Sequence, residues 1–198
     1  MLAGAVVVLL AAMALDTKVV VINSEEDVRA DVFSPEAFGI DKFPEIQASV
    51  EQRAVDAPTL AAAIAEDKKA AGEQYGVAAS IGPVIPVKFT GVAGEKKSGI
   101  YTVAVEGMPD GVGIRVQTGP AINGTDLRDA LGTIQFGDFK NQIEYQNAGS
   151  GINNAMKQAV LAEVDTSDLT GKTVTVTGVF KLINEKNWLV TPVRLSVE

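Results

Sequence analysis

The order of strands and helix in residues 83–198 restricts most strongly how this chain can fold. Five runs rich in β-branched and aromatic residues are separated by turn-forming residues, which is typical of strands: residues 84–92, 100–106, 112–117, 172–182 and 189–197. Between the third and fourth runs, apolar residues recur at helical spacing from Ile152 to Val160, and Ser150 can cap this helix. Three strands, a helix and a two-strand hairpin follow one another in an OB-fold, a five-stranded, partly open barrel.

This order predicts a β-rich α+β protein with an OB-fold-like five-stranded barrel and a helix between strands 3 and 4. An open α+β sheet packed on the helices is the alternative. One helix face and alternate strand residues should form the core: Val174, Val176, Phe180, Val193, Leu195, Ile152, Met156 and Val160. Alternate residues from Leu189 to Val197 are expected to share one face, and Trp188, beside a turn, is expected to be half-buried.

Residues 34–75 carry the signals of helices. Ser34 followed by Pro35 is typical of a helix start, Pro44 and Pro58 can each begin a further helix, and Gly72 is expected to end the last one. Their apolar face consists mostly of alanine and buries little area per residue, so these helices should pack against another element. We therefore expect three regions: residues 1–22, an export signal or membrane anchor; residues 23–80, a helical extension; and residues 81–198, the barrel domain.

The first region, residues 1–22, contains an unbroken apolar run from Leu2 to Leu15. As a helix it would be about 21 Å long, short of the roughly 30 Å hydrocarbon core of a bilayer. This length suits an export signal, and residues 12–14 (Ala-Met-Ala) match a cleavage site. Apolar residues resume at 19–22, so residues 2–22 would just span a membrane. We favour a retained inner-membrane anchor over cleavage; the alternative is a buried helix followed by a strand.

Charge and composition exclude several kinds of chemistry. The chain has 17 basic and 25 acidic residues and a formal charge of −8, which argues against nucleic acid as a partner. It has neither cysteine nor histidine, so it can form no thiolate nucleophile, no Ser-His-Asp triad and no cysteine–histidine zinc site. Any metal would need oxygen ligands alone. The prediction is therefore no metal, no cofactor and no catalytic residue.

The polar connection at residues 123–154 is the best candidate for a functional surface. Arg128 is the first choice, because its planar guanidinium can hold a carboxylate or a pair of neighbouring hydroxyl groups. Asp129, Gln142 and Asn153 are further candidates on the same surface. Amide side chains near Phe136, Phe139 and Tyr145 could line a site for a small, sugar-like ligand. In the competing interpretation Arg128 pairs with a carboxylate inside the protein, and the amides bind their own backbone.

Asp126 and Asp129 suggest an alternative function. Three residues apart, they would be neighbours on one face of a short helix, as a paired-carboxylate site of a carbohydrate hydrolase requires. The competing interpretation is a solvated helix start capped by Thr125, where carboxylates are favoured.

Three stretches carry a resemblance to a known family: residues 119–131 (GPAINGTDLRDAL), 134–145 (IQFGDFKNQIEY) and 171–180 (GKTVTVTGVF). With residues 18–29 and 189–197, they resemble a bacterial family of predicted periplasmic lipoproteins of unknown function. The resemblance implies export, membrane tethering and frequent company with sugar ABC transporter genes, and it implies no activity. A lipoprotein needs a cysteine after its signal, and Asp16 occupies that region here. We therefore expect a peptide anchor or simple secretion in place of a lipid.

Together these features predict a non-enzymatic periplasmic protein, tethered to the inner membrane or secreted. It would bind a small polar ligand or a transporter component as an accessory of sugar transport. The carbohydrate hydrolase using Asp126 and Asp129 remains the alternative.

Overall fold

The computed structural model describes Met13 and residues 33–198. The chain divides into two compact units, Met1–Phe33 and Ser34–Glu198. Apart from Met13, the apolar segment expected at residues 2–22 lies outside the described residues. Residues 34–80 of the expected helical extension and the expected barrel domain at 81–198 both lie in the second unit.

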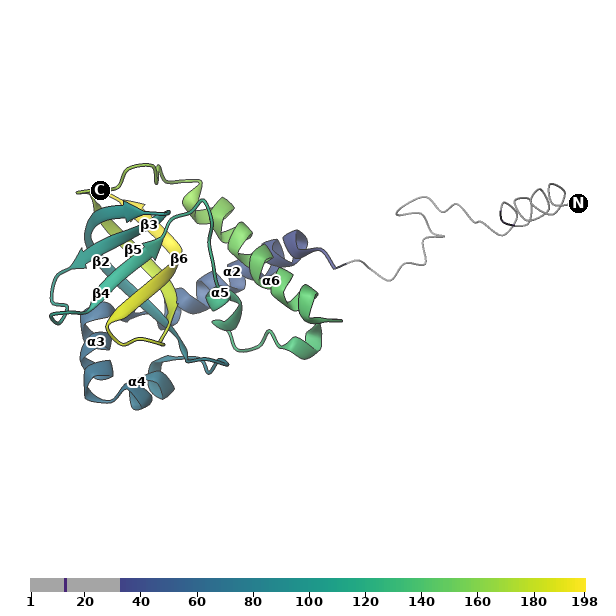
Figure 1. Cartoon of the computed structure of the whole chain (residues 1–198), viewed down its shortest axis with the longest axis horizontal. Helices are drawn as coiled ribbons and strands as arrows, with labels where there is room; N and C mark the ends of the chain where they lie inside the picture. Colours follow the sequence, from purple (N-terminus) through teal and green to yellow (C-terminus); the bar gives the residue numbers. More distant parts are fainter. Residues whose placement is uncertain (1–12, 14–32) are drawn as a thin grey trace, which may run out of the picture. The chain divides into compact units, whose positions relative to one another are not determined.

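The strands of the second unit form one sheet in the order β1-β2-β3-β4-β6-β5, and β2 also pairs with β5 (Figure 1). Its strands are β1 (Val55–Asp56), β2 (Val84–Lys97), β3 (Ile100–Val105), β4 (Gly113–Gln117), β5 (Thr173–Lys181) and β6 (Asn187–Val197). The first half of β2 pairs with β5 and its second half with β3, so the sheet closes into a ring. The five runs predicted as strands are therefore confirmed, with β2 continuing beyond the predicted end at residue 92 to Lys97.

Helices cover this ring. They are α2 (Pro35–Arg53), α3 (Ala57–Glu66), α4 (Lys68–Tyr75), the short α5 (Asp126–Asp129), the 3₁₀ turn η1 (Phe136–Asp138), α6 (Gln142–Met156) and the π-helical turn η2 (Lys157–Leu161). Helices α2 and α6 lie side by side in Figure 1, and α3 and α4 lie together near the start of β2. Ser34 caps α2 as predicted, because its hydroxyl accepts a hydrogen bond from the Ala37 N–H at 3.2 Å.

Three predicted helix boundaries are wrong. Pro44 lies inside α2 and begins no new helix. The helix that has Pro58 in its first turn, α3, ends at Glu66. Asp67 then caps the separate helix α4, so Gly72 lies within α4 and does not end it. The helix before β5 is capped by Asn141 and not by Ser150, nine residues earlier than predicted.

Two glycines explain how α2 and α6 come so close. A Cβ atom on Gly39 would overlap the Gly151 carbonyl group, and a Cβ atom on Gly151 would overlap the Pro35 carbonyl oxygen. Only glycine allows the two helix backbones to touch in this way. The contact fixes α6, and with it every site residue that α6 carries.

All eight residues predicted for the core are buried. Trp188 is fully buried, not half-buried, and it stacks on Phe180 with ring centroids 4.5 Å apart. The face predicted for the last strand holds only for its second half. A register shift opposite Thr177 and Gly178 changes which side faces inward, so Trp188 and Val190 are buried in place of Leu189.

Candidate functional site

A buried ion-pair network connects α5 to the end of β5. The Lys181 ammonium, on β5, lies 3.4 Å from an Asp126 carboxylate oxygen and 3.2 Å from one of Asp129. The Thr125 hydroxyl donates to the same Asp129 oxygen at 2.7 Å. It makes no hydrogen bond to the backbone of α5, so the capping role expected for Thr125 is wrong. The charged side chains are 11–15% exposed, so they are largely removed from water and depend on one another.

Arg128 completes this network from the other side of Asp129. Its Nε and Nη2 donate to one Asp129 carboxylate oxygen at 2.9 and 2.7 Å, and its Nη1 donates to the Tyr145 backbone carbonyl at 3.1 Å. The guanidinium lies over the Tyr145 ring, 3.6 Å from the ring centroid, in a cation–π contact. Arg128 therefore joins α5 to the first turn of α6.

Burial raises the pKa of Asp126 above its ordinary value. Loss of water is the largest cause, the ammonium of Lys181 opposes it, and the neighbouring Asp129 carboxylate adds to it. Asp126 thus carries its negative charge at a cost in free energy that Lys181 only partly offsets.

A cavity of about 380 Å³ opens beside this network. Its polar lining comes from Arg128, Asp129, Tyr145, Gln135 and Ser80, and its remaining walls from Ala78, Ala79, Gly132 and Ile134. Phe136 is 51% exposed, and its ring meets that of Tyr145 edge to face at 5.7 Å. The cavity therefore combines a cation, a carboxylate, an amide and a nearby exposed aromatic ring.

The structure brings two of the four predicted site residues to this cavity, Arg128 and Asp129. Gln142 is exposed on the first turn of α6 and is not part of the lining. Asn153 is buried and donates to the carbonyls of Gly124 and Ile122, so it holds the preceding loop against α6. For Asn153 and for the capping residue Asn141, the amide binds the backbone, as the competing interpretation predicted.

Sequence reasoning missed Lys181, Gln135 and Ser80. Lys181 lies 52 residues from Asp129 along the chain, and no local pattern links them. The lysine at the end of a buried strand was the available signal, because a charge in such a position usually has a partner. Among the residues that the structure describes, no three acidic side chains gather in a way that could hold a metal ion.

The fold class follows from a solved structure. The chain resembles an OB-fold protein from Thermotoga maritima, with a TM-score of 0.66, 17% sequence identity, and coverage of 85% of this chain and 100% of that chain. This likeness shows the fold alone, and it confirms the OB-like part of the prediction. No curated protein matches the chain in sequence.

Residues 4–196 match the family described as predicted periplasmic lipoprotein (DUF2291), and the chain belongs to that family. The resemblance found in the sequence is thereby confirmed. The family description indicates a periplasmic location and assigns no activity. Within residues 33–198, no helix is both long and apolar enough to cross a membrane.

Proposed function

We propose that this protein is a non-enzymatic periplasmic binding protein for a small polar, sugar-like ligand. One observation carries the proposal: the cavity in which the Arg128 guanidinium, stacked on Tyr145, meets the Asp129 carboxylate. A guanidinium has five N–H donors, and the hydrogen bonds of Arg128 to Asp129 and to the Tyr145 carbonyl use three of them. The remaining donors suit the oxygens of a carboxylate or of neighbouring hydroxyl groups.

The surroundings of the cavity support a polar ligand of this size. Gln135 is exposed, and its amide already binds the Gly132 carbonyl and the Asp138 backbone N–H, so it offers a ligand only its remaining N–H donor and acceptor capacity. Phe136 offers an apolar ring against which the C–H face of a sugar can pack. The ring formed by β2–β6 serves in this proposal as an OB-type five-stranded barrel that positions the loops around the cavity. A transporter component as partner rests on the family resemblance alone.

Binding is favoured over the hydrolase alternative by the placement of the two carboxylates. A catalytic pair must face the substrate from both sides of the bond to be cleaved. Asp129 lines the cavity whereas Asp126 does not, and both are paired with Lys181. No comparison supports a hydrolase activity.

Arg128→Ala is expected to abolish binding of the best ligand from a panel of neutral and acidic sugars. A ligand at 100 times its dissociation constant stabilises the parent protein by about 2.7 kcal/mol, which a thermal-shift assay detects readily. The variant itself should melt lower, because it loses hydrogen bonds to Asp129 and to the Tyr145 carbonyl.

Arg53→Ala separates these two effects. Arg53 donates to the Ala130 carbonyl at 2.7 Å, one residue after α5, and does not line the cavity. The Arg53→Ala variant should melt at a lower temperature than the parent and should keep the rise in melting temperature that the sugar causes. If the Arg128 variant also keeps that shift, Arg128 is only a structural residue and the proposed site is wrong.

We further propose that the apolar N-terminal residues 2–22 hold the protein in the inner membrane. A C-terminal reporter active only in the periplasm should be active in cells, and the full-length chain should sediment with inner-membrane vesicles. A full-length pool in the soluble cytoplasmic fraction would contradict export, and a shortened periplasmic form would show cleavage in place of anchoring.

A further inference from the structure

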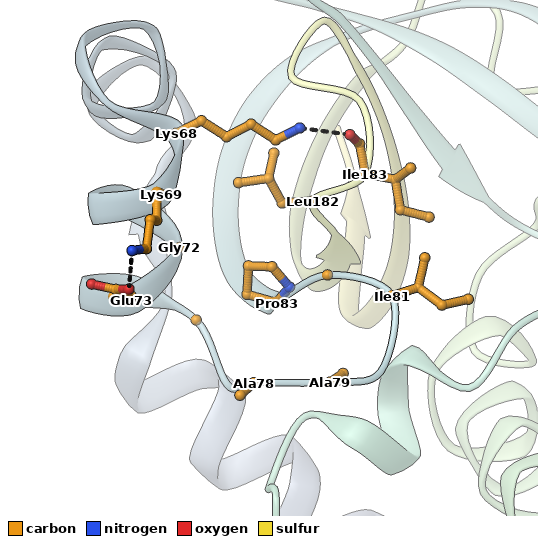
Figure 2. A pocket seen from close by; sticks show the side chains of 12 residues that line it. Lys68, Lys69, Gly72, Glu73, Ala78, Ala79, Ile81, Pro83, Leu182 and Ile183 are labelled. Atoms are coloured by element: carbon orange, nitrogen blue, oxygen red, sulfur yellow. Dashed lines mark hydrogen bonds and ion pairs between the residues drawn. The ribbon is translucent and has the colours of Figure 1, made fainter.

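A second and larger cavity, of about 690 Å³, lies between α4, the loop at residues 78–83 and the start of the β5–β6 turn (Figure 2). Its volume falls within the range of about 300–1,000 Å³ that is usual for small-molecule sites. Neither Arg128 nor Asp129 lines it, so a ligand bound here would have no contact with these two residues of the proposed sugar site. We refer to this cavity as the α4 groove.

The α4 groove is lined mainly by apolar groups. Ile81 and Ile183 are 73% and 58% exposed and lie near each other on the wall opposite α4 (Figure 2). Pro83 and the buried Leu182 lie between them and the helix. Covering such exposed isoleucines with an apolar group lowers the free energy by roughly 25 cal/mol for each Å² of apolar surface removed from water.

The shape of the α4 groove is set by close backbone packing. A Cβ atom on Gly72 would lie 2.8 Å from the Pro83 ring, and one on Gly76 would lie 2.7 Å from it. The two glycines therefore let Pro83 pack directly against α4. Packing between backbone and a proline ring, which has little conformational freedom, sets this shape, so an occupant need not spend much of its binding free energy on ordering the groove.

One side of the α4 groove carries an unbalanced positive charge. Lys69 pairs with Glu73, with 3.8 Å between the charged atoms. Lys68 reaches across the groove, and its ammonium donates to the Ile183 backbone carbonyl at 2.7 Å (Figure 2). An ammonium has three donors, and that partner is a neutral carbonyl. Lys68 is thus positioned over the apolar surface with donors and a full charge available to an anion.

We propose that the α4 groove binds a small amphipathic carboxylate, of the class of medium-chain fatty acids. Its hydrocarbon body lies against Ile81, Leu182 and Ile183, and its carboxylate binds the Lys68 ammonium. Charge complementarity selects this occupant, because the Lys68 ammonium stands over this apolar surface with a neutral carbonyl as its hydrogen-bond partner, whereas the neighbouring Lys69 is paired with Glu73. A neutral apolar ligand would make no ion pair with that ammonium.

The test is a calorimetric titration of the full chain in lipid nanodiscs with octanoate and with octanol, using empty nanodiscs as the blank. Octanoate should bind about tenfold more tightly than octanol. Lys68→Met should remove that preference, and Lys172→Met, a change at an exposed lysine outside the groove, should leave it intact. Ala78→Phe places a ring in the groove from an exposed position and should abolish binding of both compounds.

Equal affinity for octanoate and octanol in the parent protein would overturn the proposal, as would binding that persists in a folded Ala78→Phe variant. A melting curve of each variant shows that it is folded. Binding of an apolar peptide ending in a carboxylate, with no binding of octanoate, would make the groove a protein-docking site and would equally overturn the small-molecule assignment.

Discussion

Val176→Asp is expected to unfold the protein at neutral pH. Val176 is fully buried in β5, paired with Phe89 of β2 on one side and with Leu195 of β6 on the other. Because β5 has a partner strand on each side, it cannot slide or turn the new carboxylate toward water. A buried charge without a partner costs about 3–5 kcal/mol or more, which is comparable to the total stability of about 5–15 kcal/mol of an ordinary domain.

The matched control for this change is the neighbouring residue. Thr175 points to the other face of the sheet, is exposed, and shares a hydroxyl hydrogen bond of 2.9 Å with Thr90. Thr175→Asp should therefore lower the melting temperature only slightly. The measurement is thermal unfolding followed by circular dichroism. A Val176→Asp protein that melts within a few degrees of the parent would show that the inward face of β5 is wrongly assigned.

Lys181→Met is expected to be the most damaging single change near the cavity, with a loss of about 3–5 kcal/mol at pH 7. The methionine keeps the length and packing of the side chain and removes the ammonium shared by Asp126 and Asp129. Asp129 retains Arg128, whereas Asp126 loses its ion pair with Lys181. Asp126→Asn in the same chain should restore most of the loss, because it removes the unbalanced carboxylate.

The pH dependence checks the same assignment. Burial already raises the pKa of Asp126 in the folded protein, and the Lys181 ammonium counteracts this rise. Removing Lys181 therefore raises the pKa of Asp126 further. A raised carboxyl pKa means that the folded state binds the proton of Asp126 more tightly than the unfolded state does. Stability therefore falls as the pH rises from the pKa of Asp126 in the unfolded chain to its higher pKa in the folded protein. Denaturant unfolding of the Lys181→Met variant should therefore show a large deficit at pH 7 and a small one near pH 4. A deficit independent of pH would assign the effect to packing.

Most of the sheet could be predicted from the sequence, because strand patterns depend on neighbouring residues. The start of α6 could not. Residues 142–151 contain polar amides and two glycines, Gly149 and Gly151, which are locally typical of a loop. Gly151 is required because α2 touches α6 at that point, a contact between residues far apart along the chain. Simple periodicity reveals neither the register shift in β6 nor the π-helical turn after Met156, where Ala159 is exposed although its spacing from Ile152 and Met156 places it on the apolar face of a regular α-helix.

The candidate site shows the same division. Arg128 and Asp129 could be found because they lie together in a dense polar stretch. Tyr145 was noted only as one aromatic among several, and its stacking with Arg128 depends on how α6 packs. Lys181 comes from a different strand, and only the closed ring brings it beside α5.

The loop at residues 78–83 has a consequence for both cavities. Ala78 and Ala79 form part of the wall of the cavity lined by Arg128 and Asp129, and also part of the wall of the α4 groove. A molecule that fixes this loop from one side changes the surface presented to the other. Such coupling is reciprocal. If a ligand in the groove changes the affinity of the cavity for its own ligand by some factor, the ligand in the cavity changes the affinity of the groove by the same factor. Through these two alanines, the proposed polar ligand of the cavity and the proposed amphipathic ligand of the groove would alter each other's affinity within one small protein.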